Sequence, residues 1–278
     1  MLLTDSTIII TRSNIQILQI DNALATAEIS LFGGHILSFK PKHDNRERLW
    51  LSSKAILNGK KAIRGGIPIC WPWFGDHKDS QYSAHGYVRD QQWEIISSQD
   101  TPKGTLVSIK PSSSQGEGFA GNTQLVLDVL VGDTLSIQLK TKNIGSEAFK
   151  FNCALHSYFT VSDINQCQLS GLSGKYLDKT QGFDSFDTPT PYFFTEETDR
   201  VHLDKAPKVD ILDGTQITTV NSRGHDSMII WNPWQDKSIA MADMADDSYL
   251  TMLCVETAIT QGEIVKAGDT HTLEQIIS

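Results

Sequence analysis

Apolar and polar residues alternate along much of this chain with the two-residue period of a β-strand. The clearest example is Thr134–Lys142. Leu135, Ile137 and Leu139 fall on one face of this segment, and polar residues occupy the alternate positions. This pattern predicts a strand with one face buried against an apolar core.

The residues after this strand predict a turn and a second strand. Asn143–Ser146, with the sequence NIGS, has the composition of a turn, and Phe149–Phe159 is the predicted returning strand. Further predicted strands are short and are spread over the whole chain. They are Ile8–Thr11, Ala25–Ser30, Gly34–Lys40, Gln92–Ser98, Thr105–Lys110, Gln124–Val131, Gln166–Ser170, Thr215–Val220, Ser227–Asn232, Ser238–Met244, Leu250–Thr257 and His271–Ile277.

No segment has the pattern of a long amphipathic helix, although Ser52–Ile56 and Phe74–Asp76 could each form a helical turn. The predicted loops are Pro111–Gly121, Gly182–Pro191 and Lys205–Gly214. Many short strands separated by turns indicate an all-β sandwich or barrel. A length of 278 residues fits one large β domain or two smaller ones, and we expect one domain over residues 1–278.

Composition narrows the class of protein. The net charge of −9 argues against non-specific nucleic-acid binding, and no apolar run is long enough to span a membrane. The first residues read as an edge strand, because they lack the basic segment of a secretion signal. The four cysteines are Cys70, Cys153, Cys167 and Cys254. They form no CxxC pair, which argues against a zinc site. Their wide spacing favours a reduced, cytoplasmic setting.

Two segments concentrate glycine, proline, tryptophan and arginine. They are Ala62–Gly75, AIRGGIPICWPWFG, and Ala84–Glu94, AHGYVRDQQWE. Arg64 precedes two glycines, and Arg89 follows the histidine of the second segment by four residues. The pattern predicts a rigid aromatic wall with two guanidinium groups available for an anion. A tight turn packed under aromatic residues explains the glycines and prolines equally well.

Two further residues could transfer protons. His156 lies on the face of its strand opposite Phe151, Cys153 and Leu155, so it points away from the apolar row. An imidazole there is either a structural histidine or a general acid or base. Glu256 is a single carboxylate in a strand that is apolar on both faces. It is either paired with a structural arginine or is a base whose pKa is changed by burial.

The motifs in this chain resemble those of the D-hexose-6-phosphate mutarotases, the glucose-6-phosphate 1-epimerase branch of the aldose 1-epimerase superfamily. The shared motifs are, in order, RGGIPICWPWFG, HGYVR, ALHSYFTVSDI, GLSGKYLDK, EETDRVH, IIWNPW and CVETA. The resemblance runs from about Phe32 to the C-terminus, nearly the whole chain. The resemblance implies one large antiparallel β-sandwich whose concave face carries the site.

The resemblance also assigns roles to residues. The matching family histidine is the acid that protonates the ring oxygen of the sugar, which assigns that role to His156, and Glu256 matches the general base. Arg64 and Arg89 match residues that bind the 6-phosphate. His85 matches a histidine that hydrogen-bonds the sugar near the reacting centre.

Other residues are assigned less specifically. The family places an acid that contacts sugar hydroxyls at Asp199, which without the resemblance reads as part of an exposed charged turn. Four aromatic residues are either core or sugar-stacking surfaces: Trp73, Phe74, Trp231 and Trp234. Asp163 reads as a turn carboxylate. The chain departs from the common family pattern at Trp71, often Phe, and at Thr257, often Pro, which affects packing around the pocket.

The resemblance therefore implies interconversion of the α and β anomers of a hexose 6-phosphate without metal, nicotinamide or covalent nucleophile. No GxGxxG, Walker A or HExxH motif is present, so we expect no cofactor. We expect a monomer whose only partner is its small-molecule substrate. One alternative is a non-catalytic sugar-phosphate binding module. Another is a glycoside-cleaving enzyme, for which Asp199 would be the second carboxylate.

Overall fold

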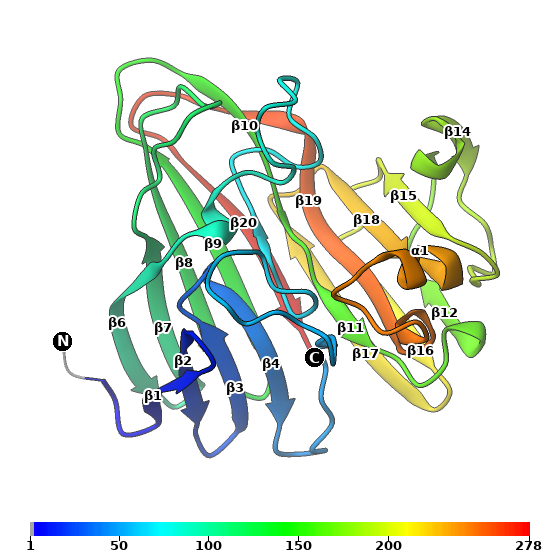
Figure 1. Ribbon diagram of the computed structural model, residues 1–278, viewed down its shortest axis with the longest axis horizontal. Coiled ribbons are helices and arrows are strands. Elements are labelled where there is room, and N and C mark those ends of the chain that lie inside the picture. Colours follow the sequence, from blue (N-terminus) through cyan, green and yellow to red (C-terminus); the bar gives the residue numbers. More distant parts are fainter. Residues whose placement is uncertain (1–2) are drawn as a thin grey trace.

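The structure is a computed structural model that describes residues 3–278. It is nearly all β, and its strands form three antiparallel sheets (Figure 1). The helical elements are short. They are α1 (Trp234–Ala240) and four 3₁₀ turns, η1 (Val88–Asp90), η2 (Ile164–Gln166), η3 (Lys179–Gln181) and η4 (Ser248–Thr251).

The first sheet is a four-stranded meander built from the N-terminal part of the chain, with the order β1-β2-β3-β4. Its strands are β1 (Thr7–Arg12), β2 (Ile15–Asp21), β3 (Ala25–Ser30) and β4 (His35–Pro41). Because β1 pairs only with β2, the edge strand predicted for the N-terminal segment is confirmed for the residues that the structure describes.

The second sheet, which we call the backing sheet, has the order β12-β16-β17-β20-β9-β8-β7-β6. Its strands are β6 (Trp93–Thr101), β7 (Gly104–Pro111), β8 (Thr123–Val131), β9 (Leu135–Asn143), β12 (Cys167–Ser170), β16 (Lys208–Asp213), β17 (Gln216–Arg223) and β20 (Thr270–Ile277). The alternation predicted over Thr134–Lys142 is confirmed by β9, whose apolar face is buried.

The third sheet, which we call the site sheet, has the order β14-β13-β15-β18-β19-β10-β5, and β11 also pairs with β19. Its strands are β5 (Ile69–Cys70), β10 (Phe149–Leu155), β11 (Tyr158–Thr160), β13 (Lys175–Asp178), β14 (Asp184–Asp187), β15 (Thr198–His202), β18 (Ser227–Asn232) and β19 (Met252–Val265). In Figure 1, β14 and α1 lie at the end of the molecule away from β6.

One continuous apolar cluster joins the three sheets. It includes Phe39 from the first sheet, Leu127 and Leu273 from the backing sheet, and Leu155 and Val255 from the site sheet. Burial of apolar surface is the main force that holds such layers together. The all-β prediction is confirmed. The single-domain organisation stays a prediction, which this shared core supports.

The pairing predicted around Asn143–Ser146 is wrong. Phe149–Phe159 does not return beside β9: it forms β10 and β11, which pair with β19 in the site sheet. The turn is therefore a crossing between two sheets. This crossing could not be predicted from the residues, because a buried strand has the same alternation in either sheet.

Several other element predictions also differ from the structure. Ser238–Met244 holds the end of α1 and a turn, and the predicted loop Lys205–Gly214 contains β16. The predicted loop Gly182–Pro191 contains β14. Strand β2 was missed because its apolar residues face two different clusters, which breaks the alternation: Ile15 and Ile17 join one cluster, and Leu18 and Ile20 join the other.

All four cysteines are free and buried, including Cys167, which follows a polar turn. Within residues 3–278, no helix is both long enough and apolar enough to cross a membrane.

Candidate active site

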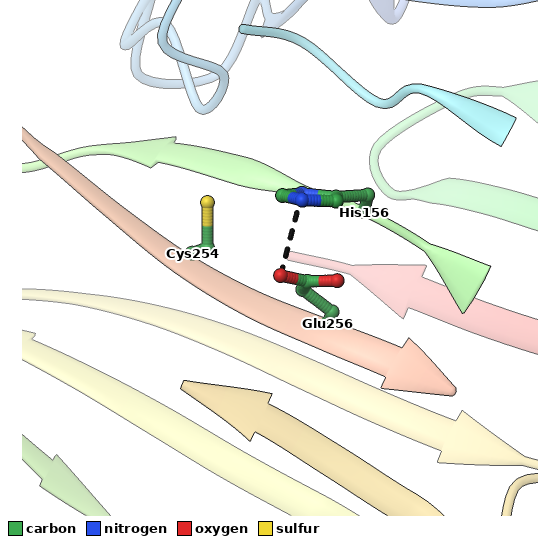
Figure 2. A group of neighbouring side chains, drawn as sticks. All are labelled: His156, Cys254 and Glu256. Atoms are coloured by element: carbon green, nitrogen blue, oxygen red, sulfur yellow. Dashed lines mark ion pairs between the residues drawn. The ribbon is translucent and has the colours of Figure 1, made fainter. Parts of the chain in front are cut away.

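The site sheet brings His156 and Glu256 into contact. His156 follows the last residue of β10 and precedes β11, and both strands pair with β19, which carries Glu256. Nδ1 of His156 lies 3.3 Å from Oε1 of Glu256 (Figure 2). On β19, Leu253 and Val255 point into the shared core, so Cys254 and Glu256 point away from it.

This pair is buried and incompletely hydrogen-bonded. The Glu256 side chain is 1% exposed and that of His156 is 13% exposed. Among residues 3–278, neither Nδ1 of His156 nor Oε2 of Glu256 has a hydrogen-bond partner. Buried polar atoms without partners are rare because desolvation is costly. Their presence on one sheet face is typical of a site built for a polar ligand.

Burial changes the acidity of both groups. Desolvation, followed by the charge of Asp199, raises the pKa of Glu256 well above its ordinary value. Desolvation also lowers the pKa of His156 well below its ordinary value, and the nearby groups His85, Arg89 and Arg64 lower it further. Strong, opposite shifts in two adjacent titratable groups are characteristic of acid–base sites.

Arg64 is connected to His156 through Tyr158. Its Nη1 donates a hydrogen bond of 3.0 Å to the Tyr158 hydroxyl, and its Nε lies 3.2 Å from a carboxylate oxygen of Asp243. The Tyr158 ring stacks on the His156 imidazole, with 5.0 Å between centroids and 10° between planes. Within residues 3–278, Nη2 of Arg64 makes no hydrogen bond and is free to bind a ligand.

His85 and Arg89 approach the same histidine from the second glycine-rich segment. The His85 and His156 ring centroids are 5.6 Å apart. Nδ1 of His85 accepts a hydrogen bond from the backbone of Gly75, so its Nε2 carries the hydrogen and can donate. Burial and the charge of Arg89 lower the pKa of His85 to about 3, which keeps this donor neutral. Nη2 of Arg89 donates to the carbonyl of Ala84, and its buried Nε has no partner in the described chain.

The glycines in these segments permit close backbone contacts. A Cβ on Gly65 would lie 2.5 Å from the carbonyl oxygen of Trp50, and one on Gly86 would lie 1.9 Å from that of Trp71. Both glycines also have positive φ angles, of 103° and 75°. The two glycine-rich segments therefore form tight turns and also hold Arg64 and Arg89 beside His156 and Glu256. The structural and the ligand-binding interpretations of these segments are compatible.

Asp199 lies two strands away from Glu256 in the same sheet. It sits on β15 opposite Trp231 of β18, which in turn pairs with Cys254 of β19. Its Oδ2 is 2.9 Å from Nζ of Lys179, the first residue of η3. The alternative interpretation of Asp199 as part of an exposed charged turn is wrong, because Asp199 is buried within a strand, and its contact with sugar hydroxyls stays a prediction.

A pocket of about 580 Å³ lies on the same side of the site sheet as Asp199, and Lys179 and His85 help to line it. Its lining is mostly apolar and includes Phe74, His85, Lys179 and Val201. The Phe74 ring is 6.4 Å from the His156 ring. A cavity of this size can hold a small polar molecule.

The aromatic candidates divide into two groups. Trp231 and Phe74 lie beside His156, with Trp231 at a ring distance of 6.3 Å. Trp73 packs instead with His77, Tyr82 and Tyr87, and Trp234 packs on Tyr249 at the edge of the core. The turn interpretation of Asp163 is confirmed, since it caps η2 through a hydrogen bond from the backbone of Asn165.

Sequence reasoning missed four residues of this site: Tyr158, Lys179, Asp243 and Cys254. Tyr158 had a signal, because it follows His156 by two residues on the same strand face. Lys179 lies inside the motif GLSGKYLDK, but no local pattern links it to Asp199. Asp243 approaches Arg64 from a segment predicted as a strand. Cys254 gave no local signal, because it lies in a strand that is apolar on both faces.

One group in the described chain has the donor atoms to hold a metal ion. One ligand atom each from His156, Cys254 and Glu256 lies within 4.8 Å of the others (Figure 2).

The antiparallel β-sandwich of this chain is the fold of galactose mutarotase-like proteins. The solved structures agree. A Salmonella typhimurium crystal structure described as "a putative mutarotase" superposes with a TM-score of 0.92 at 30% identity, covering 99% of this chain and 94% of that one. A galactose mutarotase-like protein from Lactobacillus casei, at 17% identity and a TM-score of 0.72, shares the fold over 94% of this chain and 99% of its own.

The chain belongs to the aldose 1-epimerase family, whose model matches residues 16–278. An Escherichia coli K12 relative named "Putative glucose-6-phosphate 1-epimerase" is 32% identical over 269 residues, covering 94% of this chain and 90% of the relative. A relative of the same name from Cenchrus ciliaris is 34% identical over 262 residues, covering 87% and 78%. The family resemblance seen in the motifs is confirmed, and a sugar is the substrate class that this family implies.

Proposed function

We propose that this protein interconverts the α and β anomers of a D-hexose 6-phosphate by acid–base opening and closure of the sugar ring. The observation that carries the proposal is the 3.3 Å separation of Nδ1 of His156 and Oε1 of Glu256. In a cyclic sugar, the ring oxygen and the C1 hydroxyl are both bonded to C1. An acid and a base that act on these two oxygens must therefore be close neighbours, and this pair meets that requirement.

Ring opening and ring closure each transfer protons between the sugar and the two side chains His156 and Glu256. Glu256 removes the proton of the C1 hydroxyl while the bond between C1 and the ring oxygen breaks, and His156 gives a proton to the ring oxygen. The open aldehyde rotates about the C1–C2 bond. Ring closure reverses both transfers on the other face of the aldehyde, and the pair returns to its starting protonation state.

Without substrate, the pKa directions place a proton shared by the pair on Glu256 rather than on His156. The raised pKa of Glu256 makes its carboxylate a stronger base than an exposed one. Burial lowers the pKa of His156 most, and the charges of His85, Arg89 and Arg64 lower it further. A phosphate dianion bound by these arginines would offset their charge. Substrate binding would then favour the protonated imidazole that donates to the ring oxygen.

The remaining polar groups supply binding and orientation. The protein carries a net charge of −9, so an anionic substrate requires local positive charge, and Arg64 and Arg89 supply it beside His156. His85 donates a hydrogen bond through Nε2, and Asp199 accepts hydrogen bonds from sugar hydroxyls. A glycoside-cleaving role for Asp199 is less favoured, because Lys179 already pairs with its carboxylate.

The test is anomer exchange measured by NMR on glucose 6-phosphate and on free glucose with the purified protein. We expect exchange well above the spontaneous rate on the phosphorylated sugar and much slower exchange on glucose. Binding of glucose 6-phosphate with no faster exchange would instead identify a binding module. The free, buried cysteines support our further proposal of a cytoplasmic location.

A further inference from the structure

Three chemically different donors meet at the centre of the site sheet. Cys254 and Glu256 project from β19 toward His156, which lies above them (Figure 2). The thiol, the carboxylate and the imidazole each place one donor atom within 4.8 Å of the other two. Sulfur, nitrogen and oxygen donors in one group suit a borderline-soft divalent ion such as Zn²⁺.

The spacing of the donors fits such an ion. Zinc binds imidazole nitrogen and carboxylate oxygen at about 2.0–2.1 Å, and two such ligands of a tetrahedron lie about 3.3 Å apart. Nδ1 of His156 and Oε1 of Glu256 are 3.3 Å apart. Sγ of Cys254 lies within 4.8 Å of the histidine and glutamate donors, so a side-chain rotation that brings it closer would complete the set at the zinc–sulfur bond length of about 2.3 Å.

Donor atoms of His156 and Glu256 have no hydrogen-bond partner that an ion would have to displace, and packing holds Cys254 in place. Nδ1 of His156 and Oε2 of Glu256 are buried without partners in the described chain, and Glu256 is 1% exposed. Cys254 is fixed in a cluster with Tyr158, Trp231 and Met252. Three protein donors leave the fourth position of a tetrahedron for water or for a sugar hydroxyl.

We propose that His156, Cys254 and Glu256 form a binding site for a thiophilic divalent ion, best matched by Zn²⁺, and that this ion inhibits the enzyme. The ion occupies the acid and the base together, so it competes with the sugar. Binding replaces the thiol proton, which passes to the buffer. The inhibitory effect rests on the proposed anomer exchange, whereas binding of the ion does not.

The binding experiment needs no substrate. Co²⁺, which takes the place of zinc and reports a bound thiolate by a charge-transfer absorption band, is added to wild type, Cys254→Ala and Cys254→Ser, and Zn²⁺ affinity is measured by calorimetry. The control is Cys70→Ala, because Cys70 is equally buried but lies outside the three-donor group. We expect the band and tight binding in wild type and in the control. Both Cys254 variants should lose the band and bind Zn²⁺ at least about tenfold more weakly.

The inhibition experiment repeats the NMR exchange assay with added Zn²⁺, in a buffer free of inorganic phosphate. Wild type and Cys70→Ala should be inhibited and should recover with a chelator, while whatever activity Cys254→Ser has should resist the ion. Equal Zn²⁺ affinity in wild type and both Cys254 variants, or no thiolate band, would overturn the site. If wild type binds the ion through Cys254 but shows no exchange with any sugar phosphate, the proposed function fails and the metal site stands.

Discussion

Lys179 forms a partly buried ion pair with Asp199, with 2.9 Å between Nζ and Oδ2. Each member of this pair acts on Glu256 from a distance: the charge of Asp199 raises the pKa of Glu256, and the charge of Lys179 lowers it. The pair therefore adjusts the strength of the proposed base without touching it. Burial also raises the pKa of Asp199, and the charge and hydrogen bond of Lys179 offset part of that rise.

We predict that Lys179→Met shifts the acidic limb of the pH–rate profile toward higher pH. Removing the ammonium group raises the pKa of Glu256 further, and a base is active only above its pKa. The measurement is kcat/KM for anomer exchange over a range of about pH 5 to 9. Lys175→Met is the control, because it removes an exposed ion pair with Asp187 on the neighbouring strand. An unchanged acidic limb in Lys179→Met would show that this lysine does not tune Glu256.

The fold class was predictable because strand alternation and turn composition are local signals. Thr134–Lys142 shows this, since its apolar face is buried in β9 as expected. The partner of a strand is not a local property. Phe149–Phe159 has the same pattern whether it pairs with β9 or crosses to β19, so the crossing at Asn143 could not be read from the sequence.

The same distinction applies to the site. His156 and Glu256 were identifiable because each breaks a local rule: one leaves an apolar row, and the other places a charge in an apolar strand. Lys179 breaks no rule, since a lysine after a strand is ordinary. Its proposed role in the site comes only from its contact with Asp199, which lies 20 positions further along the chain. Long-range polar contacts of this kind require the fold.

Glu256→Gln is expected to abolish nearly all anomer exchange while sugar-phosphate binding persists. Glutamine keeps the shape of the side chain but cannot accept the proton from the C1 hydroxyl. The check combines NMR exchange rates with calorimetric binding of glucose 6-phosphate. Glutamine is uncharged and of the same size, so its burial carries no ionic desolvation cost and thermal stability should not fall. Exchange at the wild-type rate in this variant would exclude Glu256 as the base.

Acid should destabilise the protein partly through His35. This histidine on β4 is buried, and its Nε2 donates a 2.6 Å hydrogen bond to the carbonyl of Gly65, directly after Arg64. Burial lowers the pKa of His35 from 6.5 to about 4. Between these values the unfolded chain binds a proton that the folded chain does not, so stability falls as pH decreases from about 6.5 to about 4. The loss from this one group is of the order of 3 kcal/mol.

The measurement is the free energy of unfolding in urea at pH 7 and pH 4.5. We predict that His35→Gln weakens the dependence on pH, because glutamine can donate to Gly65 but does not titrate in this range. His43→Gln is the matched control, since the side chain of His43 is 53% exposed. The same pH dependence in His35→Gln as in wild type would assign the acid sensitivity to other groups, such as His202, whose pKa burial also lowers to about 4.

The arginines beside the histidine–glutamate pair should determine selectivity for phosphorylated sugars. Arg64→Ala and Arg89→Ala are each predicted to reduce activity on glucose 6-phosphate far more than activity on glucose. A charge-assisted hydrogen bond contributes about 1.5–3 kcal/mol, or roughly tenfold to somewhat over a hundredfold in KM. The assay is NMR exchange with both sugars, and Arg223→Ala, at a side chain 82% exposed, is the control.

Arg64 also has a structural contact, and a further variant separates the two roles. Asp243→Asn removes the carboxylate that pairs with Nε of Arg64 but keeps the guanidinium group. If Arg64 binds phosphate, this variant should keep its selectivity, and its KM for glucose 6-phosphate should stay the same or fall, because one competing negative charge is gone. Inorganic phosphate should inhibit wild type competitively and the two arginine variants less. Equal losses on both sugars in Arg64→Ala and Arg89→Ala, together with a similar loss in Asp243→Asn, would assign the arginines to structure rather than to phosphate binding.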